Sequence, residues 1–215
     1  RELGALVAYP TVSSSPILQI AAHLAQRAED VGFVVERFDD PADSGKTNIV
    51  ATVGPREAAG GLVISGHMDV VPVDNQPWSS DPFHMVERDG RLYGRGTADM
   101  KGFIAATVIA LQRMDLRRLA RPLTLIWTHD EEIGCKGSAA LAATLLAEER
   151  RLPRDCLIGE PTDFQVLRMH AGHVGARVTA TGAAAHSAFP ELGANAIEAA
   201  GIAIGALRGL AAELR

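Results

Sequence analysis

The apolar positions of the chain alternate between the spacing of amphipathic helices and the unbroken runs of buried strands. The first helical stretch follows Ser15-Pro16, residues that favour a helix start, and ends at Gly32. The same spacing predicts helices over 100–116 and 138–150. Apolar or β-branched runs predict strands at 33–38, 48–53, 62–65, 123–128 and 155–158.

This order of elements predicts an α/β fold, in which helices sandwich a mixed sheet. The short apolar run 62–65 is typical of a strand in the buried middle of such a sheet. We predict a loop around Pro41 and Gly45, and a second, long loop over 66–90.

The pattern changes after Thr162. Strands of a half-exposed sheet are predicted at 166–169 and 174–181, and an Ala-rich helix over 194–214. We therefore divide the chain into a domain 1–166 and the first part of an α+β domain, 167–215. The chain begins without Met and stops inside a helical pattern, so we expect it to be a fragment.

Charge and cysteine content narrow the possible partners and compartment. The net charge is −5 and the Lys and Arg residues form no block, which argues against a nucleic-acid partner. The longest apolar stretch, 194–214, carries charged residues, so we expect no membrane span. Two cysteines, Cys135 and Cys156, do not suggest a disulfide framework, so we expect a cytoplasmic protein.

Acidic and imidazole side chains stand where the predicted strands end. They are His67 and Asp69, Asp99, Glu131 and Glu132, and Glu160. Open α/β sheets bind ligands outside the carboxyl ends of their strands, so the clusters that follow strands are expected to converge. One imidazole among several carboxylates suits zinc, cobalt or manganese. Without a cation between them these carboxylates would repel one another, so the pattern predicts a metal site.

Each member also has a purely structural explanation. His67 could be a hydrogen-bonded histidine of the core, and Asp69 only a cap or a turn former. Asp99 could cap the helix that follows it. Glu131 and Glu132 could be acids of a first helical turn, and Glu160 a solvated strand end. We favour a site because four such clusters coincide with strand ends or a helix start.

Seven segments carry a family resemblance. They are Tyr9–Ser13 (YPTVS), Gly66–Pro72 (GHMDVVP), Trp78–Phe83 (WSSDPF), Leu92–Phe103 (LYGRGTADMKGF), Asp130–Cys135 (DEEIGC), Ile158–Thr162 (IGEPT) and Gly182–Asn195. Together they resemble the di-zinc aminoacylase/carboxypeptidase superfamily, and most closely its acetylornithine deacetylase branch. The segments 81–83 and 96–103 favour this branch over the succinyl-diaminopimelate desuccinylases.

The resemblance implies roles for the strand-end residues. His67 and Glu160 would bind one zinc ion, and cobalt is an alternative metal. Asp99 would bridge this ion to a second one held by Glu132. Glu131 would be the general base and acid of the reaction.

The resemblance extends to three more side chains. Asp69 would accept the other imidazole N–H of His67 and so orient the ring. His186 would be a lid histidine that reaches the active site of the partner subunit and stabilises the oxyanion. Asn195 would lie near the substrate, although it also suits a helix N-cap.

The same resemblance implies the domain roles and the reaction. Residues 1–166 would be the N-terminal part of a zinc-peptidase-like catalytic domain that lacks its return segment and one further histidine ligand. Residues 167–215 would begin a lid through which the protein forms a homodimer. The expected reaction converts N-acetylornithine to ornithine and acetate in arginine biosynthesis. The alternatives are a succinyl-diaminopimelate desuccinylase, an aminoacylase, a dipeptidase, or a non-catalytic dimerising homologue or fragment.

Overall fold

The computed structural model describes residues 1–13, 15–56, 58–169, 172 and 175–214. These residues form two compact units, Arg1–Val166 and Leu167–Arg215. The catalytic and lid roles of these units stay predictions.

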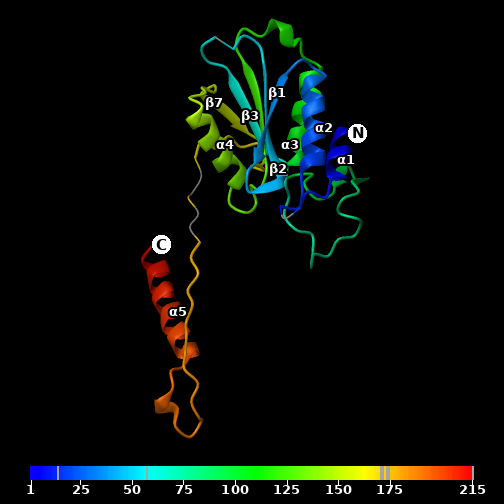
Figure 1. Ribbon diagram of the computed structural model, residues 1–215. Helices are drawn as coiled ribbons and strands as arrows, with labels where there is room; N and C mark the ends of the chain where they lie inside the picture. The colour runs from blue at the N-terminus through cyan, green and yellow to red at the C-terminus, as the bar shows by residue number, and fades with distance from the viewer. Residues whose placement is uncertain (14, 57, 170–171, 173–174, 215) are drawn as a thin grey trace. The chain divides into compact units, whose positions relative to one another are not determined.

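The first unit is built on a five-stranded sheet of order β1-β2-β6-β3-β7 (Figure 1). Its strands are β1 (Val34–Asp40), β2 (Asp43–Val53), β3 (Leu62–His67), β6 (Leu123–Thr128) and β7 (Asp155–Ile158). β2 runs antiparallel to both β1 and β6, whereas β3 runs parallel to β6 and β7. The predicted α/β fold with a mixed sheet is confirmed.

Helices pack on both faces of this sheet. The helices are α1 (Glu2–Val7), α2 (Leu18–Glu29), α3 (Lys101–Gln112) and α4 (Lys136–Ala147). The larger apolar core joins α1, α2 and α3 to the sheet through residues such as Leu24, Ile104 and Leu125. A smaller core joins α4 to the other face through Leu141 and Val63, so the sheet is buried between two helical layers.

Several predicted bounds are wrong. α2 begins at Leu18 and not at Ser15-Pro16, because the backbone N–H of Ile17 donates to Gly45 O (2.9 Å) and is drawn toward β2. β2 already begins at Asp43, so Gly45 lies in a strand and the predicted loop shrinks to a tight turn.

The segment between β3 and α3 also differs from the prediction of one long loop. It contains a small hairpin of β4 (Val86–Arg88) and β5 (Arg91–Tyr93). Strands of three residues are too short to show an alternating pattern. α3 ends at Gln112, and a short 3-10 helix, η1 (Leu116–Arg118), follows it.

The second unit contains η2 (Pro190–Leu192) and α5 (Ala196–Glu213). The strands predicted at 166–169 and 174–181 are wrong where the structure describes them, since 166–169 and 175–181 form no strand. A strand needs a hydrogen-bonding neighbour, and the described part of this unit shows only the bridge between Ala183 and Ala194. No helix in the described part of the chain has the length and apolar character needed to cross a membrane.

Candidate metal centre

The carboxyl ends of β6, β3 and β7 meet at one edge of the sheet because these neighbouring strands are parallel. His67 is the last residue of β3 and pairs with Thr128, the last residue of β6. Glu131 and Glu132 follow β6 within a few residues, and Glu160 follows β7. The sheet topology therefore brings three of the predicted clusters to one place.

The donor atoms of these side chains lie close enough to share a cation. His67 Nε2 is 3.0 Å from Asp99 Oδ1 and 3.8 Å from Glu160 Oε1. One donor atom from each of these three residues lies within 4.8 Å of the others, and the same holds for His67, Glu131 and Glu132. The two groups share His67, and the bridging role of Asp99 stays a prediction.

The structural explanations offered for three of the acids are wrong. Asp99 does not cap α3, because Met100 holds the N-cap position and no side chain caps that helix. Glu131 and Glu132 are not in the first turn of α4, which begins only at Lys136.

Asp69 contacts the His67 ring mainly through its backbone. His67 Nδ1 is 2.9 Å from the backbone oxygen of Asp69 and 3.6 Å from its carboxylate Oδ1. The fully buried carboxylate instead accepts from Ser13 Oγ (2.7 Å), Glu131 N (3.0 Å) and Glu132 N (3.3 Å). Asp69 thus fixes the histidine with its carbonyl and the two glutamates with its side chain.

The electrostatics of the cluster are dominated by negative charge. Burial, and then the charge of Asp99, raises the pKa of Glu132, and burial with the charges of Asp99 and Glu131 raises that of Glu160. Burial acts to lower the pKa of His67, but Asp69 and Asp99 outweigh it and raise that pKa to about 11. A divalent cation would relieve this repulsion, so the donor set fits a zinc-type metal.

Buried polar residues that the sequence analysis did not single out support the centre. Lys46 lies in β2, and its Nζ donates to Asp130 Oδ1 at 2.7 Å and to the backbone oxygen of Ser13. Lys101 Nζ donates to Tyr9 O at 2.7 Å, and burial lowers its pKa to about 7. The available signal in the sequence was the position of Lys46, two residues before the predicted strand 48–53.

His186 and Asn195 belong to the second unit. His186 is exposed, and its Nδ1 accepts from Ala188 N at 3.1 Å. Asn195 is the N-cap of α5, where its side-chain oxygen accepts from Ile197 N at 2.9 Å. The capping explanation for Asn195 is therefore observed, and the substrate roles of both residues stay predictions.

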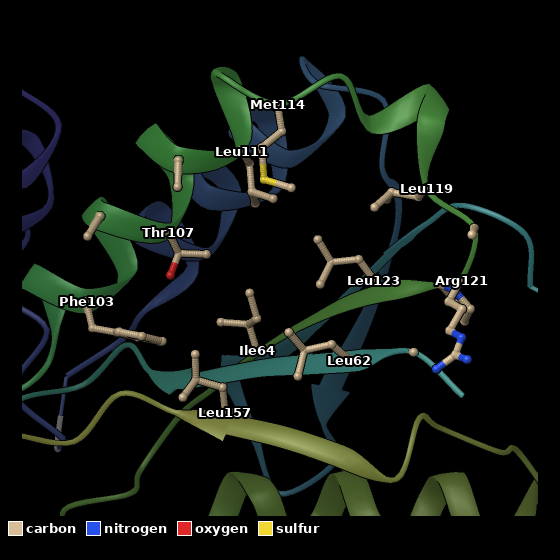
Figure 2. A pocket seen from close by; sticks show the side chains of 15 residues that line it. Leu62, Ile64, Phe103, Thr107, Leu111, Met114, Leu119, Arg121, Leu123 and Leu157 are labelled. Carbon is tan, nitrogen blue, oxygen red and sulfur yellow. The ribbon is translucent and has the colours of Figure 1, made fainter. Parts of the chain in front are cut away.

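An apolar cavity of about 730 Å³ lies in the first unit, lined mainly by α3 and by strands of the sheet. Figure 2 shows Phe103 of α3, Ile64 of β3 and Leu157 of β7 around it. None of the predicted site residues, all of which the structure describes, lines this cavity. The candidate centre is therefore the cluster at the strand ends.

Residues 63–213 match the family model described as peptidase family M20/M25/M40. The chain belongs to this family. The resemblance seen in the sequence is thereby confirmed at the level of the M20 family, whereas the acetylornithine deacetylase branch stays a prediction. The matched segment contains every residue of the candidate metal centre.

Solved structures show the same fold as this M20 chain. Human carnosine dipeptidase 1 is 27% identical over 73% of this chain, with a TM-score of 0.59. An M20 family metallo-carboxypeptidase from Sulfolobus solfataricus is 23% identical over 73% (TM-score 0.63). A tripeptidase from Staphylococcus aureus is 20% identical over 95% (TM-score 0.68). The chain spans 37%, 36% and 54% of these three structures' lengths, respectively.

Proposed function

We propose that this M20 chain carries the catalytic residues of a zinc-dependent amidohydrolase that removes the acyl group from an N-acyl amino acid. N-acetylornithine is the proposed substrate, and ornithine and acetate are the products. The observation that supports this most directly is the cluster of His67, Asp99, Glu131, Glu132 and Glu160 at the ends of parallel strands. The choice of substrate rests on the sequence motifs shared with acetylornithine deacetylases.

The chain's own residues provide two donor groups for metal. His67, Asp99 and Glu160 form one group, and Glu132 with His67 belongs to the other. A bound metal supplies Lewis-acid polarisation of the amide carbonyl and makes water more acidic. Cobalt would be an effective substitute for zinc with these ligands.

Glu131 is the proton carrier in this proposal. Its backbone N–H is held by Asp69 Oδ1 at 3.0 Å, so the turn that presents its carboxylate is fixed. The carboxylate takes a proton from the attacking water and delivers it to the amine nitrogen as the C–N bond breaks. The water oxygen bonds to the carbonyl carbon, which becomes the carboxylate of the acyl product, and the amine is the leaving group.

A dipeptidase is the second candidate, because carnosine dipeptidase 1 has a related fold and sequence. Both reactions hydrolyse an amide next to an amino acid. A succinyl-diaminopimelate desuccinylase, an aminoacylase and a non-catalytic dimerising homologue are further alternatives. We also propose a cytoplasmic homodimer formed through the second unit, where α5 exposes apolar side chains such as Ile202 and Leu207.

A substrate panel tests the proposal. The zinc- and cobalt-loaded protein is offered N-acetylornithine, N-succinyl-diaminopimelate, N-acetylmethionine and carnosine, and the released amine is quantified. We expect the highest kcat/KM with N-acetylornithine. Preference for carnosine would favour the dipeptidase, and metal binding without turnover of any substrate would favour the non-catalytic homologue or fragment over an active amidohydrolase.

Glu131→Gln tests the role of the base within the same panel. We expect turnover to fall by about 10²–10⁴-fold, because the amide cannot accept the proton. Zinc stoichiometry should stay unchanged, and its loss would instead make Glu131 a ligand, as its place among the donor groups permits. Glu29→Gln, at an exposed position of α2, is the matched control and should leave turnover unchanged.

A further inference from the structure

Lys46 is a buried cation beside the metal centre that takes no part in the proposed chemistry. Its side chain is only 3% exposed. Burying an ammonium group costs several kcal/mol unless it is paired and hydrogen-bonded. The pairing is provided by Asp130 Oδ1 at 2.7 Å, and the backbone oxygen of Ser13 accepts a further hydrogen bond.

Both partners of Lys46 are connected to Asp69 of the metal centre by one further hydrogen bond. Ser13 Oγ donates to Asp69 Oδ2 at 2.7 Å. Asp130 precedes Glu131, whose backbone N–H donates to Asp69 Oδ1 at 3.0 Å. These contacts close a ring of Lys46, Asp130, Glu131, Asp69 and Ser13, which we name the Lys46 ring. It ties β2 and the segment before α2 to the turn that carries the catalytic glutamates.

A second side chain of β2 holds the same turn. Asn48 Oδ1 accepts from His129 N at 3.2 Å, and its Nδ2 donates to Gly137 O at 3.1 Å. Asn48 and Lys46 are two positions apart in one strand and therefore point to the same side. Asn48 holds the backbone on both sides of the turn, at His129 and Gly137, whereas Lys46 holds Asp130 near its start and is linked to Asp69 through Ser13.

We propose that Lys46 is a positioning residue of the metal centre. Through Asp130 and Ser13 it locks the turn of Glu131 and Glu132 against Asp69, so that both carboxylates face His67. Lys46 itself touches neither substrate nor metal. The part of this role that concerns catalysis rests on the proposed function, but the effect on metal binding does not.

Lys46→Met tests the role because methionine keeps much of the apolar stem and removes the charge. Cobalt binding is titrated by visible absorption, and kcat and KM are measured with the best substrate of the panel. We expect the cobalt Kd to rise about 10–100-fold, as for other residues that orient metal ligands. The cobalt spectrum should change, and kcat should fall with little change in KM.

Arg150→Met is the matched control. It removes an ion pair in which both guanidinium nitrogens lie 2.8 Å from the Glu36 carboxylate of β1. Among the described residues, no hydrogen bond or ion pair joins this pair to the Lys46 ring, so the cobalt Kd should stay within about twofold of the wild-type value. An equal loss of cobalt affinity in Arg150→Met and Lys46→Met would overturn the proposal, because the effect would then be one of general stability.

Ser13→Ala keeps the test decisive if Lys46→Met does not fold. It breaks the ring at Asp69 and leaves no buried charge unpaired, so a weaker cobalt Kd is again expected. Wild-type cobalt affinity and spectrum in Ser13→Ala, or in a folded Lys46→Met, would overturn the proposal. Wild-type protein that binds cobalt but hydrolyses no substrate would refute the proposed function alone, and the cobalt titrations would still decide the role of Lys46.

Discussion

At the scale of single residues, the position of Glu160 depends on a close approach between α3 and the end of β7. Gly159 precedes Glu160, and a Cβ atom built on this glycine would lie 1.9 Å from Cγ of Phe103 in α3. No side chain fits there without displacing an aromatic ring. The small residue therefore lets the strand end bring a metal-type ligand against the helix.

Gly159→Ala should accordingly lower the free energy of unfolding by about 1–3 kcal/mol, the usual cost of overpacking. Urea denaturation would measure it. In a Phe103→Ala background, which lacks the ring, Gly159→Ala should be much less destabilising. The unfolding free energies of the two single variants should therefore not add up to that of the double variant. Gly205→Ala in α5, where a Cβ meets nothing within 4 Å, should be neutral or stabilising. An equally neutral Gly159→Ala would contradict the close approach.

At the scale of elements, α1 is tied to α2 by one carboxylate. Glu2 Oε1 is 2.9 Å from His23 Nε2, and Glu2 Oε2 is 2.9 Å from a guanidinium nitrogen of Arg27. Burial acts to raise the pKa of Glu2, but His23 and Arg27 together lower it below its usual value of 4.5. The folded state therefore prefers the ionised form of this carboxyl more strongly than the unfolded chain does.

Glu2→Gln should cost about 1–2 kcal/mol of unfolding free energy at neutral pH. Because the folded pKa is depressed, the stabilisation is present above pH 4.5 and lost as the pH falls through the folded pKa. Urea titrations of the wild type and Glu2→Gln at pH 7 and at about pH 3 would measure this. The difference between their unfolding free energies should be smaller at the lower pH. A difference independent of pH would count against this ion pair, and exposed Glu29→Gln should show no difference at either pH.

The cap of α5 separates two explanations for Asn195. Asn195→Ala should reduce the helix content of α5 and cost about 1 kcal/mol, because the N–H of Ile197 loses its acceptor. Asn195→Asp keeps that acceptor and should preserve the helix, as far-UV circular dichroism would show. If Asn195→Asp raised KM while the helix stayed intact, the predicted role near the substrate would gain support.

The bounds of helices and strands were predictable where a single pattern of apolar and polar residues extended over the whole element. β6 and β7 were predicted with their observed bounds, since apolar runs between polar segments identify buried strands. The start of α2 was not, because the N–H of Ile17 bonds to β2, a tertiary contact without a local signature. The strands expected in the second unit failed because alternation alone provides no pairing partner.

The residues of the metal centre were predicted from their positions at strand ends. The buried residues that hold them in place were not predicted. His67, Glu131 and Glu160 stand at the ends of strands that proved to be parallel neighbours. Lys46 and Ser13 are of types that usually face solvent, so only the folded chain reveals their buried contacts. Composition and spacing show where polar and charged residues stand in the chain, but not which residues they contact after folding.

At the scale of the whole molecule, a metal would join segments that are otherwise held mainly by the sheet. His67 ends β3, Glu160 follows β7, and Asp99 precedes α3. A ligand that binds only the folded state adds to its stability by mass action. Zinc should therefore act as a cross-link of the first unit.

Zinc at 100 times its Kd should raise the free energy of unfolding by about 2.7 kcal/mol, and a chelator should reverse the effect. Differential scanning calorimetry with zinc and with chelator would record this as a shift in Tm. His67→Ala, which removes the residue shared by both donor groups, should abolish the shift. A chelator-sensitive Tm that persists in His67→Ala would place the metal elsewhere.

The contacts of the Lys46 ring also determine when the centre can form during folding. They join residues far apart in the chain: 56 positions for Ser13 and Asp69, 62 for Asp69 and Glu131, and 84 for Lys46 and Asp130. Such non-local contacts form slowly, because long loops must close first. During refolding, the circular dichroism of the helices should therefore appear early and the visible absorption of bound cobalt last. Metal binding would then report that folding is complete, and the metal would not serve as a template for folding.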